Sequence, residues 1–132
     1  MITVVLIFIS GLSQAIIESI HIKFYQSIFY RFICWKHQNR ERWWNAAVSW
    51  KNKYKNGATH SGRKSITVMY IKFPIPSLFY SATDLFRFIS FLSLIMSIPF
   101  YSSMFGYWHH DFMLFFFIWN STRILFKSIF LV

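Results

Sequence analysis

Two pairs of ionisable side chains lie at the ends of long apolar stretches in this 132-residue chain, and each pair has the same spacing. Glu18 precedes His21 by three residues, and Asp84 precedes Arg87 by three residues. This spacing places both members of a pair on one face of a helix. Glu-x-x-His is also the spacing with which helical bundles hold metal ions. One hypothesis is therefore that Glu18, His21 and Asp84 bind a divalent metal or relay protons.

The competing interpretation requires only that these charges neutralise one another. Ionisable groups at membrane depth are costly unless they are paired. Arg123 and Lys127 lie in a later apolar segment, where Arg123 can face a carboxylate from each of two other helices. We favour pairing over metal binding. The predicted intramembrane polar cluster consists of Glu18, His21, Asp84, Arg87, Arg123 and Lys127.

Other enzyme chemistry has little support in the sequence. His109, His110 and Asp111 form a second candidate ligand group, but they adjoin Trp108 and fit a solvated interfacial turn better. The chain contains no Gly-rich phosphate loop, Gly-x-Ser-x-Gly elbow, Cys-x-x-Cys pair or His-Glu-x-x-His motif. We therefore predict no cofactor, and a membrane-embedded metal enzyme stays only as an alternative.

The composition indicates what surrounds these residues. Apolar types make up 55% of the chain and charged residues only 14%, whereas a soluble domain has about 25% charged residues. The 17 Phe, 7 Tyr and 6 Trp exceed what one small core can bury. An apolar solvent is needed for the surplus, so the sequence predicts a membrane protein.

The apolar residues fall into three segments. Residues 1–20 predict a first transmembrane helix, since 20 helical residues span about 30 Å. A cleaved secretory signal is the alternative, although no Lys or Arg precedes Lys23 as a signal would require. Residues 77–105 predict a second crossing that Pro99 kinks and that Ser81 or Thr83 caps.

The last apolar segment is less uniform than the first two. Residues 106–111 predict a short external turn, and residues 112–132 predict a third helix. Its second half contains Asn120, Ser121, Thr122, Arg123 and Lys127. Because these residues are polar, a re-entrant or interfacial helix is the alternative to a full crossing.

The positive charge lies almost wholly between the first two crossings. The segment from Arg31 to Lys72 holds ten of the 14 Lys and Arg residues and one acid, Glu41. Lys23 and Arg31 share a side opposite an apolar stripe, so residues 21–35 predict an amphipathic interfacial helix. Residues 36–76 predict a basic loop. Because basic loops stay in the cytoplasm, we expect the N-terminus outside and an integral location in a bacterial inner membrane.

Tryptophan and cations alternate within the basic loop. Such residues anchor proteins at the level of anionic lipid headgroups, or they bind single-stranded nucleic acid. The flanking apolar segments favour lipid, and nucleic acid is the less favoured partner. The predicted lipid or partner patch consists of Arg40, Arg42, Trp43, Trp44, Trp50, Lys51, Lys53 and Lys55.

The stretch from Trp44 to Asn56 reads Trp-Asn-Ala-Ala-Val-Ser-Trp-Lys-Asn-Lys-Tyr-Lys-Asn. It resembles small uncharacterised membrane proteins of Bacteroidetes-type bacteria and their phages. In that family a His ends the first helix and a Thr-Asp pair opens the second, and His21 and Thr83 with Asp84 match these places. The resemblance implies the membrane class and this layout, and it implies no activity.

Together these patterns predict a mainly α fold, namely a small polytopic membrane protein with two to three transmembrane helices and one amphipathic interfacial helix. The favoured function is an accessory or scaffold protein that presents the basic aromatic patch to anionic lipid or an acidic partner. The alternatives are the metal enzyme and an oligomeric pore or holin-like protein. A pore would be a homo-oligomer exposing Asn120, Ser121, Thr122 and Arg123 to its lumen.

Overall fold

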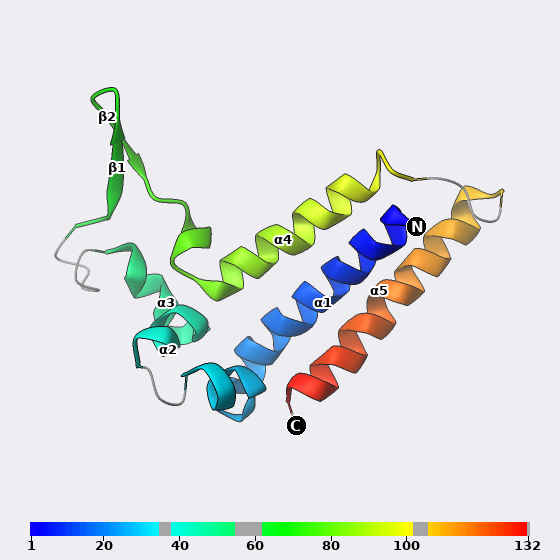
Figure 1. Cartoon of the computed structure of the whole chain (residues 1–132), viewed down its shortest axis with the longest axis horizontal. Coiled ribbons are helices and arrows are strands. Elements are labelled where there is room, and N and C mark those ends of the chain that lie inside the picture. The colour runs from blue at the N-terminus through cyan, green and yellow to red at the C-terminus, as the bar shows by residue number, and fades with distance from the viewer. Residues whose placement is uncertain (35–37, 55–61, 102–105, 132) are drawn as a thin grey trace.

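The computed structural model describes residues 1–34, 38–54, 62–101 and 106–131, and these are mainly helical. Its three long helices are α1 (Ile2–Lys23), α4 (Ala82–Ser97) and α5 (Trp108–Phe130). They lie side by side in one layer, with α1 in the middle (Figure 1). The middle helix α1 therefore makes the contacts with both α4 and α5.

The three helices alternate in direction along the chain (Figure 1). The chain runs along α1, returns along α4, and then follows α5 parallel to α1 (Figure 1). At one end of the layer the Thr3 hydroxyl donates to the Phe100 carbonyl at 2.7 Å. At the other end the Phe29 and Phe130 rings meet edge to face at 5.1 Å. The N-terminus and the start of α5 thus share one end, and the C-terminus lies at the other.

Small residues fill the contacts between these helices. Ser10, Gly11, Ala15 and Ser19 of α1 are buried. A Cβ atom on Gly11 would lie 2.8 Å from the Trp119 carbonyl oxygen, so α1 and α5 approach closely at that point. Close approach at small residues is typical of helix packing within membranes.

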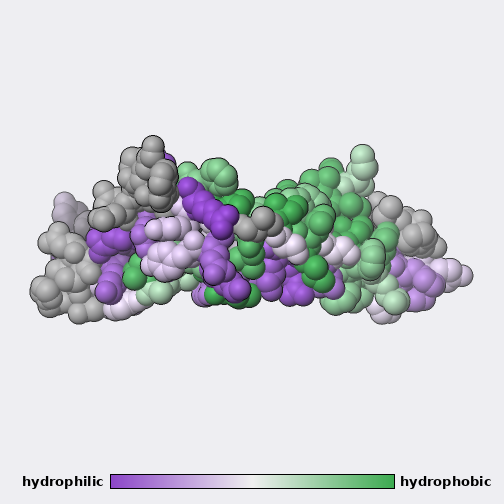
Figure 2. Space-filling model, turned by 90° about the horizontal axis from the view of Figure 1, so that it is seen from below, coloured by the Kyte–Doolittle hydropathy of each residue, from purple (hydrophilic) through white to green (hydrophobic). Residues whose placement is uncertain are grey.

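Large apolar side chains, in contrast, point outward from α4 and α5. The exposed ones on these two helices include Phe88, Phe91, Leu92, Phe112, Met113, Phe116, Phe117, Ile124 and Leu125. In Figure 2 hydrophobic surface covers much of the helical part, whereas hydrophilic surface lies toward both ends and along the lower edge. The middle helix α1 therefore buries small residues together with several isoleucines, whereas α4 and α5 expose most of their large apolar side chains.

The segment between α1 and α4 forms a lobe at the C-terminal end of α1 (Figure 1). Its elements are the short helices η1 (Phe24–Gln26), η2 (Tyr30–Cys34), α2 (Gln38–Trp44), α3 (Ala46–Ser49), η3 (Trp50–Lys53) and η6 (Ser77–Phe79), and the strands β1 (Ser65–Val68) and β2 (Ile71–Pro74). Phe24 and Phe29 belong to the buried apolar cluster that joins it to α1 and α4. Trp44 stacks on Phe29 at 5.0 Å.

Strands β1 and β2 form an antiparallel hairpin that projects from the lobe (Figure 1). Val68 pairs with Ile71, so Met69 and Tyr70 alone make the turn. Both have positive φ, 48° and 68°, as a type I′ turn requires. Side chains larger than Gly or Asn are strained in this region.

The predicted amphipathic helix over residues 21–35 is not one continuous helix. The first helix extends to Lys23, and the backbone becomes extended at Ser27, with ψ near 155°. The Ser27 N–H donates to the Lys23 and Phe24 carbonyls, both at 3.0 Å, and its hydroxyl also donates to the Phe24 carbonyl at 2.6 Å, so the chain turns here. This turn brings Phe24 and Phe29 into the same cluster.

The second apolar segment is also shorter than its predicted range. Of residues 77–105, α4 takes only Ala82–Ser97, about 24 Å at 1.5 Å per residue. The helix ends before Pro99 instead of kinking there, because proline has no N–H with which to continue the helical hydrogen bonds.

The helix in the third apolar segment begins earlier than predicted. The helix begins at Trp108, so His109, His110 and Asp111 lie in its first turn and not in an external turn over 106–111. Within the described part of the chain, two helices are suited by length and composition to cross a membrane, Ile2–Gln26 and Trp108–Phe130. The short α4 is not among them.

Candidate functional site

One half of the predicted polar cluster forms between α1 and α5. Arg123 Nη1 donates to Glu18 Oε1 at 2.8 Å, and Lys127 Nζ lies 2.9 Å from Glu18 Oε2. The Glu18 side chain is 19% exposed. Arg123 also donates to Asn120 Oδ1 at 2.9 Å and lies over the Trp119 ring at 5.4 Å. Two cations therefore share one carboxylate at this interface.

The other half of the cluster is separate. Asp84 pairs with Arg87 of its own helix at 3.1 Å, and the Arg87 side chain is 63% exposed. Asp84 thus does not complete a carboxylate pair around Arg123. An exposed ion pair of this kind contributes little to stability. His21 is exposed and lines a cavity together with Asp84 and Arg87.

The geometry offers no support for the metal hypotheses. Within the described ranges, His, Cys, Asp and Glu side chains do not form any group of three that could hold a metal ion. Glu18, His21 and Asp84 therefore do not converge. Near the start of α5 the rings of His109 and His110 lie 4.3 Å apart, while Asp111 is buried and accepts a hydrogen bond from the Tyr101 hydroxyl.

Three of the four residues that a pore would expose to its lumen are buried or bonded within the chain. Thr122 is buried and would be in contact with a side chain at Gly11, and Arg123 pairs with Glu18. Asn120 accepts from Arg123. Of the four residues, Ser121 is exposed.

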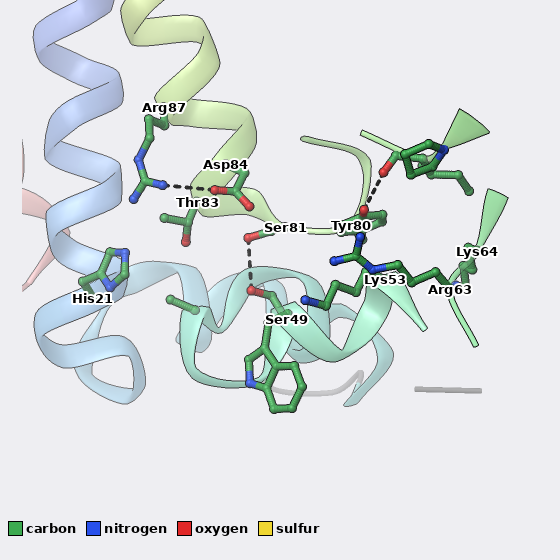
Figure 3. Close-up of a pocket in the computed structure, with 14 residues that line it drawn as sticks. His21, Ser49, Lys53, Arg63, Lys64, Tyr80, Ser81, Thr83, Asp84 and Arg87 are labelled. Atoms are coloured by element: carbon green, nitrogen blue, oxygen red, sulfur yellow. Dashed lines mark hydrogen bonds and ion pairs between the residues drawn. The ribbon is translucent and has the colours of Figure 1, made fainter. Parts of the chain in front are cut away.

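A cavity of about 460 Å³ lies between the lobe and the helices α1 and α4. Figure 3 shows side chains from these three parts surrounding it. The described residues that line it are His21, Ala46, Ser49, Trp50, Lys53, Arg63, Lys64, Pro74, Ile75, Tyr80, Ser81, Thr83, Asp84 and Arg87.

The backbone of the lobe places cations around this cavity. Tyr54 and Arg63 form an isolated antiparallel bridge, and the Lys64 N–H donates to the Lys53 carbonyl at 2.9 Å. The end of η3 is thereby held beside the start of the hairpin. Lys53, Arg63 and Lys64, which are far from α4 in sequence, face the same space as Arg87 (Figure 3).

Two further contacts fix the lobe against the start of α4. Ser49 Oγ and Ser81 Oγ lie 3.0 Å apart and are buried. Asn52 donates from one side-chain nitrogen to the carbonyls of Arg42 and Tyr80, both at 2.9 Å. These contacts therefore hold the lobe wall of the cavity in place against the α4 wall.

The hydrogen bonding at the start of α4 is incomplete. Ser81 occupies the N-cap position but makes no capping hydrogen bond with its side chain, because its hydroxyl pairs with Ser49. Thr83 is 5% exposed, and its buried Oγ1 has no hydrogen-bond partner. The predicted cap at Ser81 or Thr83 is thus not formed by either side chain.

Comparison of the chain with protein-family models, with curated proteins and with solved structures gives no match. The site is therefore interpreted from its own geometry.

The predicted patch is distributed over the lobe. Arg40 and Arg42 are exposed on α2, Trp43 is half-buried beside them, and Trp44 packs on Phe29. Trp50 and Lys51 are exposed, with Lys51 Nζ 5.6 Å from the Trp50 ring centroid.

Of the described patch residues, Trp50 and Lys53 line the cavity. Lys55 lies outside the described residues.

Sequence reasoning did not select several lining residues, namely Ser49, Arg63, Lys64 and Tyr80. Their positions relative to α4 depend on the fold of the lobe. The basic character of the segment from Arg31 to Lys72 was the available signal, but it does not distinguish Arg63 and Lys64 from Lys72.

Proposed function

We propose that this chain is a small integral membrane protein that acts as an accessory or scaffold, with its lobe at a cytoplasmic surface rich in anionic lipid. The observation that best supports this proposal is the distribution of small and large apolar residues in the helical layer. Small residues such as Ser10, Gly11 and Ala15 are buried, while Phe116 and Phe117 are exposed. Water disfavours such a surface, whereas acyl chains solvate it.

The arrangement of the ends supports an orientation. The lobe and the N-terminus lie at opposite ends of α1 (Figure 1). Since the lobe carries most of the Lys and Arg, the positive-inside rule puts it in the cytoplasm and Met1 outside. The short α4 then returns through the bilayer with help from its flanking turns, a three-crossing arrangement that this proposal requires.

The lobe has suitable groups for a headgroup layer. Trp50 is exposed next to Lys51, and Lys53 Nζ lies 5.1 Å from the Tyr54 ring centroid. Aromatic rings are favoured at the membrane interface, and each cation near an anionic surface gains about 1 kcal/mol.

Cysteine labelling tests the orientation directly. In a Cys34→Ser background, Lys72→Cys reports on the hairpin and His109→Cys on the start of α5, and both positions are exposed. In intact cells an impermeant maleimide is expected to label position 109 alone, and position 72 only after the membrane is disrupted. Labelling of both from the same side would overturn the three-crossing arrangement. Labelling in detergent serves as the control that both thiols react.

Quenching by brominated lipids tests the lipid partner. The signal is the Trp50 contribution, taken as the difference between the wild type and Trp50→Phe in liposomes. Brominated phosphatidylglycerol is expected to quench it more than brominated phosphatidylcholine, and Arg42→Gln with Lys51→Gln should remove that preference. Lys72→Gln, on the projecting hairpin, is the matched control. Equal quenching by the two lipids in the wild type would contradict a preference for anionic lipid.

A further inference from the structure

We propose that the cavity between the lobe and α4 is a binding site for a phosphate monoester group. Its lining residues carry positive charge, an unpaired buried hydroxyl and the first residues of a helix. The inference rests on the proposed membrane function only for the source of the phosphate, and the binding itself follows from the site.

The cavity wall is positively charged. Lys53, Arg63, Lys64 and Arg87 line the cavity, and Asp84 is the one carboxylate among its described lining residues. With His21 neutral, the wall carries a net charge of +3. The other three acids of the chain are occupied elsewhere: Glu18 by Arg123 and Lys127, Glu41 by Tyr25, and Asp111 by Tyr101.

Backbone contacts fix the segments that carry the lobe cations. The bridge between Tyr54 and Arg63 and the bond from the Lys64 N–H to the Lys53 carbonyl join two segments of the lobe. An anion in this space would meet cations from η3, from the start of the hairpin and from α4.

The start of α4 supplies the second argument. The first N–H groups of a helix have no partners within the helix, and they bind phosphate readily. The N-cap residue Ser81 makes no capping hydrogen bond with its side chain, and its hydroxyl lies 3.0 Å from that of Ser49. Phosphate oxygens would satisfy these donors.

Thr83 is the third and independent argument. Its side chain is 5% exposed, its Oγ1 has no partner, and it lines the cavity. Figure 3 shows the Thr83 hydroxyl directed from α4 toward the space between His21 and Ser49. A buried hydroxyl without a partner is costly, and an anion in the cavity would accept its hydrogen bond.

The size and place of the cavity indicate the ligand class. A phosphate monoester carries a charge of about −1.5 to −2 and offers three acceptor oxygens. About 460 Å³ accommodates this group with part of the molecule that bears it. The cavity lies at the lobe end of α1 and α4, so a lipid headgroup or a soluble phosphate ester can both supply the phosphate.

Binding to the full-length protein in nonionic detergent tests the site. The probes are dihexanoyl phosphatidic acid, dihexanoyl phosphatidylcholine and inorganic phosphate, with titrations followed by calorimetry. Phosphatidic acid is expected to saturate one site, whereas phosphatidylcholine should not. If inorganic phosphate at millimolar concentration fails to displace the lipid, the source is a headgroup; if it displaces the lipid, the site accepts soluble phosphate.

Matched variants separate this site from general basicity. Thr83→Val keeps the shape of the side chain but removes the hydroxyl, and it is expected to weaken binding about tenfold. Thr83→Ser retains the hydroxyl and is expected to retain binding. Lys53→Gln should weaken binding by a similar factor, and Lys51→Gln, on the same short helix but outside the cavity, should not. Equal losses in the two Lys variants, or no saturable binding of either phosphate probe, would overturn the site. The cysteine labelling result is independent of these titrations, so failure of the membrane proposal is distinguishable.

Discussion

Arg123 Nη1 donates a hydrogen bond to Glu18 Oε1 at 2.8 Å, and this contact joins the middle helix α1 to α5, which runs parallel to it (Figure 1). Lys127 takes the second carboxylate oxygen at 2.9 Å. The acid is mostly buried, at 19% exposure. One carboxylate therefore holds the C-terminal half of α5 against α1.

Removal of this charge leaves two cations facing each other. Glu18→Gln is expected to lower the free energy of unfolding by about 2 kcal/mol, less than the 3 to 5 kcal/mol of a fully buried pair, because both cations are partly exposed. Unfolding of the purified protein in mixed micelles, followed by circular dichroism, measures the change. Asp84→Asn removes the exposed pair with Arg87 and should cost under about 1 kcal/mol. Equal losses in the two variants would mean that the Glu18 pair has no special role.

Gly11 tests the close approach of α1 and α5. A Cβ atom there would lie 2.8 Å from the Trp119 carbonyl oxygen and 3.1 Å from Thr122 Cβ. Gly11→Ala should destabilise the protein by about 1 to 3 kcal/mol through overpacking, although alanine is the better helix former by about 1 kcal/mol. The same unfolding assay reports it.

Ser13→Ala is the control for that substitution. Ser13 is buried on α1, and the structure shows its hydroxyl bonded within its own helix, to the Ile9 carbonyl at 2.9 Å. Its loss should change stability by under about 1 kcal/mol. A stabilised Gly11→Ala would show that the two helices do not meet at this position.

Replacing the hairpin turn should relieve backbone strain. Met69 and Tyr70 both have positive φ, which costs about 1 to 2 kcal/mol per residue for ordinary side chains. The double change Met69→Asn and Tyr70→Gly supplies the residues that a type I′ turn favours. Amide exchange of the paired residues in β1 and β2 is expected to slow by at least about fivefold. Exchange in α1 should stay unchanged, and faster exchange in the hairpin would contradict the turn geometry.

Substitutions at Phe117 test whether this face of α5 is surrounded by lipid or by water. Its side chain is 69% exposed near the middle of the helix. In water Phe117→Lys would be nearly neutral, whereas at the centre of a bilayer a Lys costs about 2.5 to 3.5 kcal/mol. We expect the variant to insert poorly in a translocon assay with engineered glycosylation sites. Phe117→Leu should insert like the wild type, and normal insertion of Phe117→Lys would place this face away from lipid.

Thr83→Val links stability to the cavity. In the empty protein, removal of an unpartnered buried hydroxyl should raise the free energy of unfolding by up to about 1 to 3 kcal/mol. Binding of phosphatidic acid should fall in the same variant. A loss of stability without added phosphate would show that the hydroxyl has a partner within the chain.

The extent of the helices was only partly predictable from local sequence. Hydropathy predicted helices in the three apolar segments, and they are present. It overestimated the second, which ends before Pro99, and left open the third, which is a 23-residue helix. The break at Ser27 was missed, because a serine that bonds the Phe24 carbonyl looks in sequence like any exposed helical residue.

The sequence by itself determined the composition of the layer and the position of the positive charge, because apolar content and charge are properties of each segment. Tertiary structure alone decided which groups meet. Glu18 and Arg123 are 105 residues apart, and their pairing depends on how α1 and α5 are rotated against each other. The cavity exists because the bridge at Tyr54 and Arg63 brings the lobe to the uncapped start of α4. Such contacts follow from the packing of distant segments, which local patterns of charge and hydropathy do not encode.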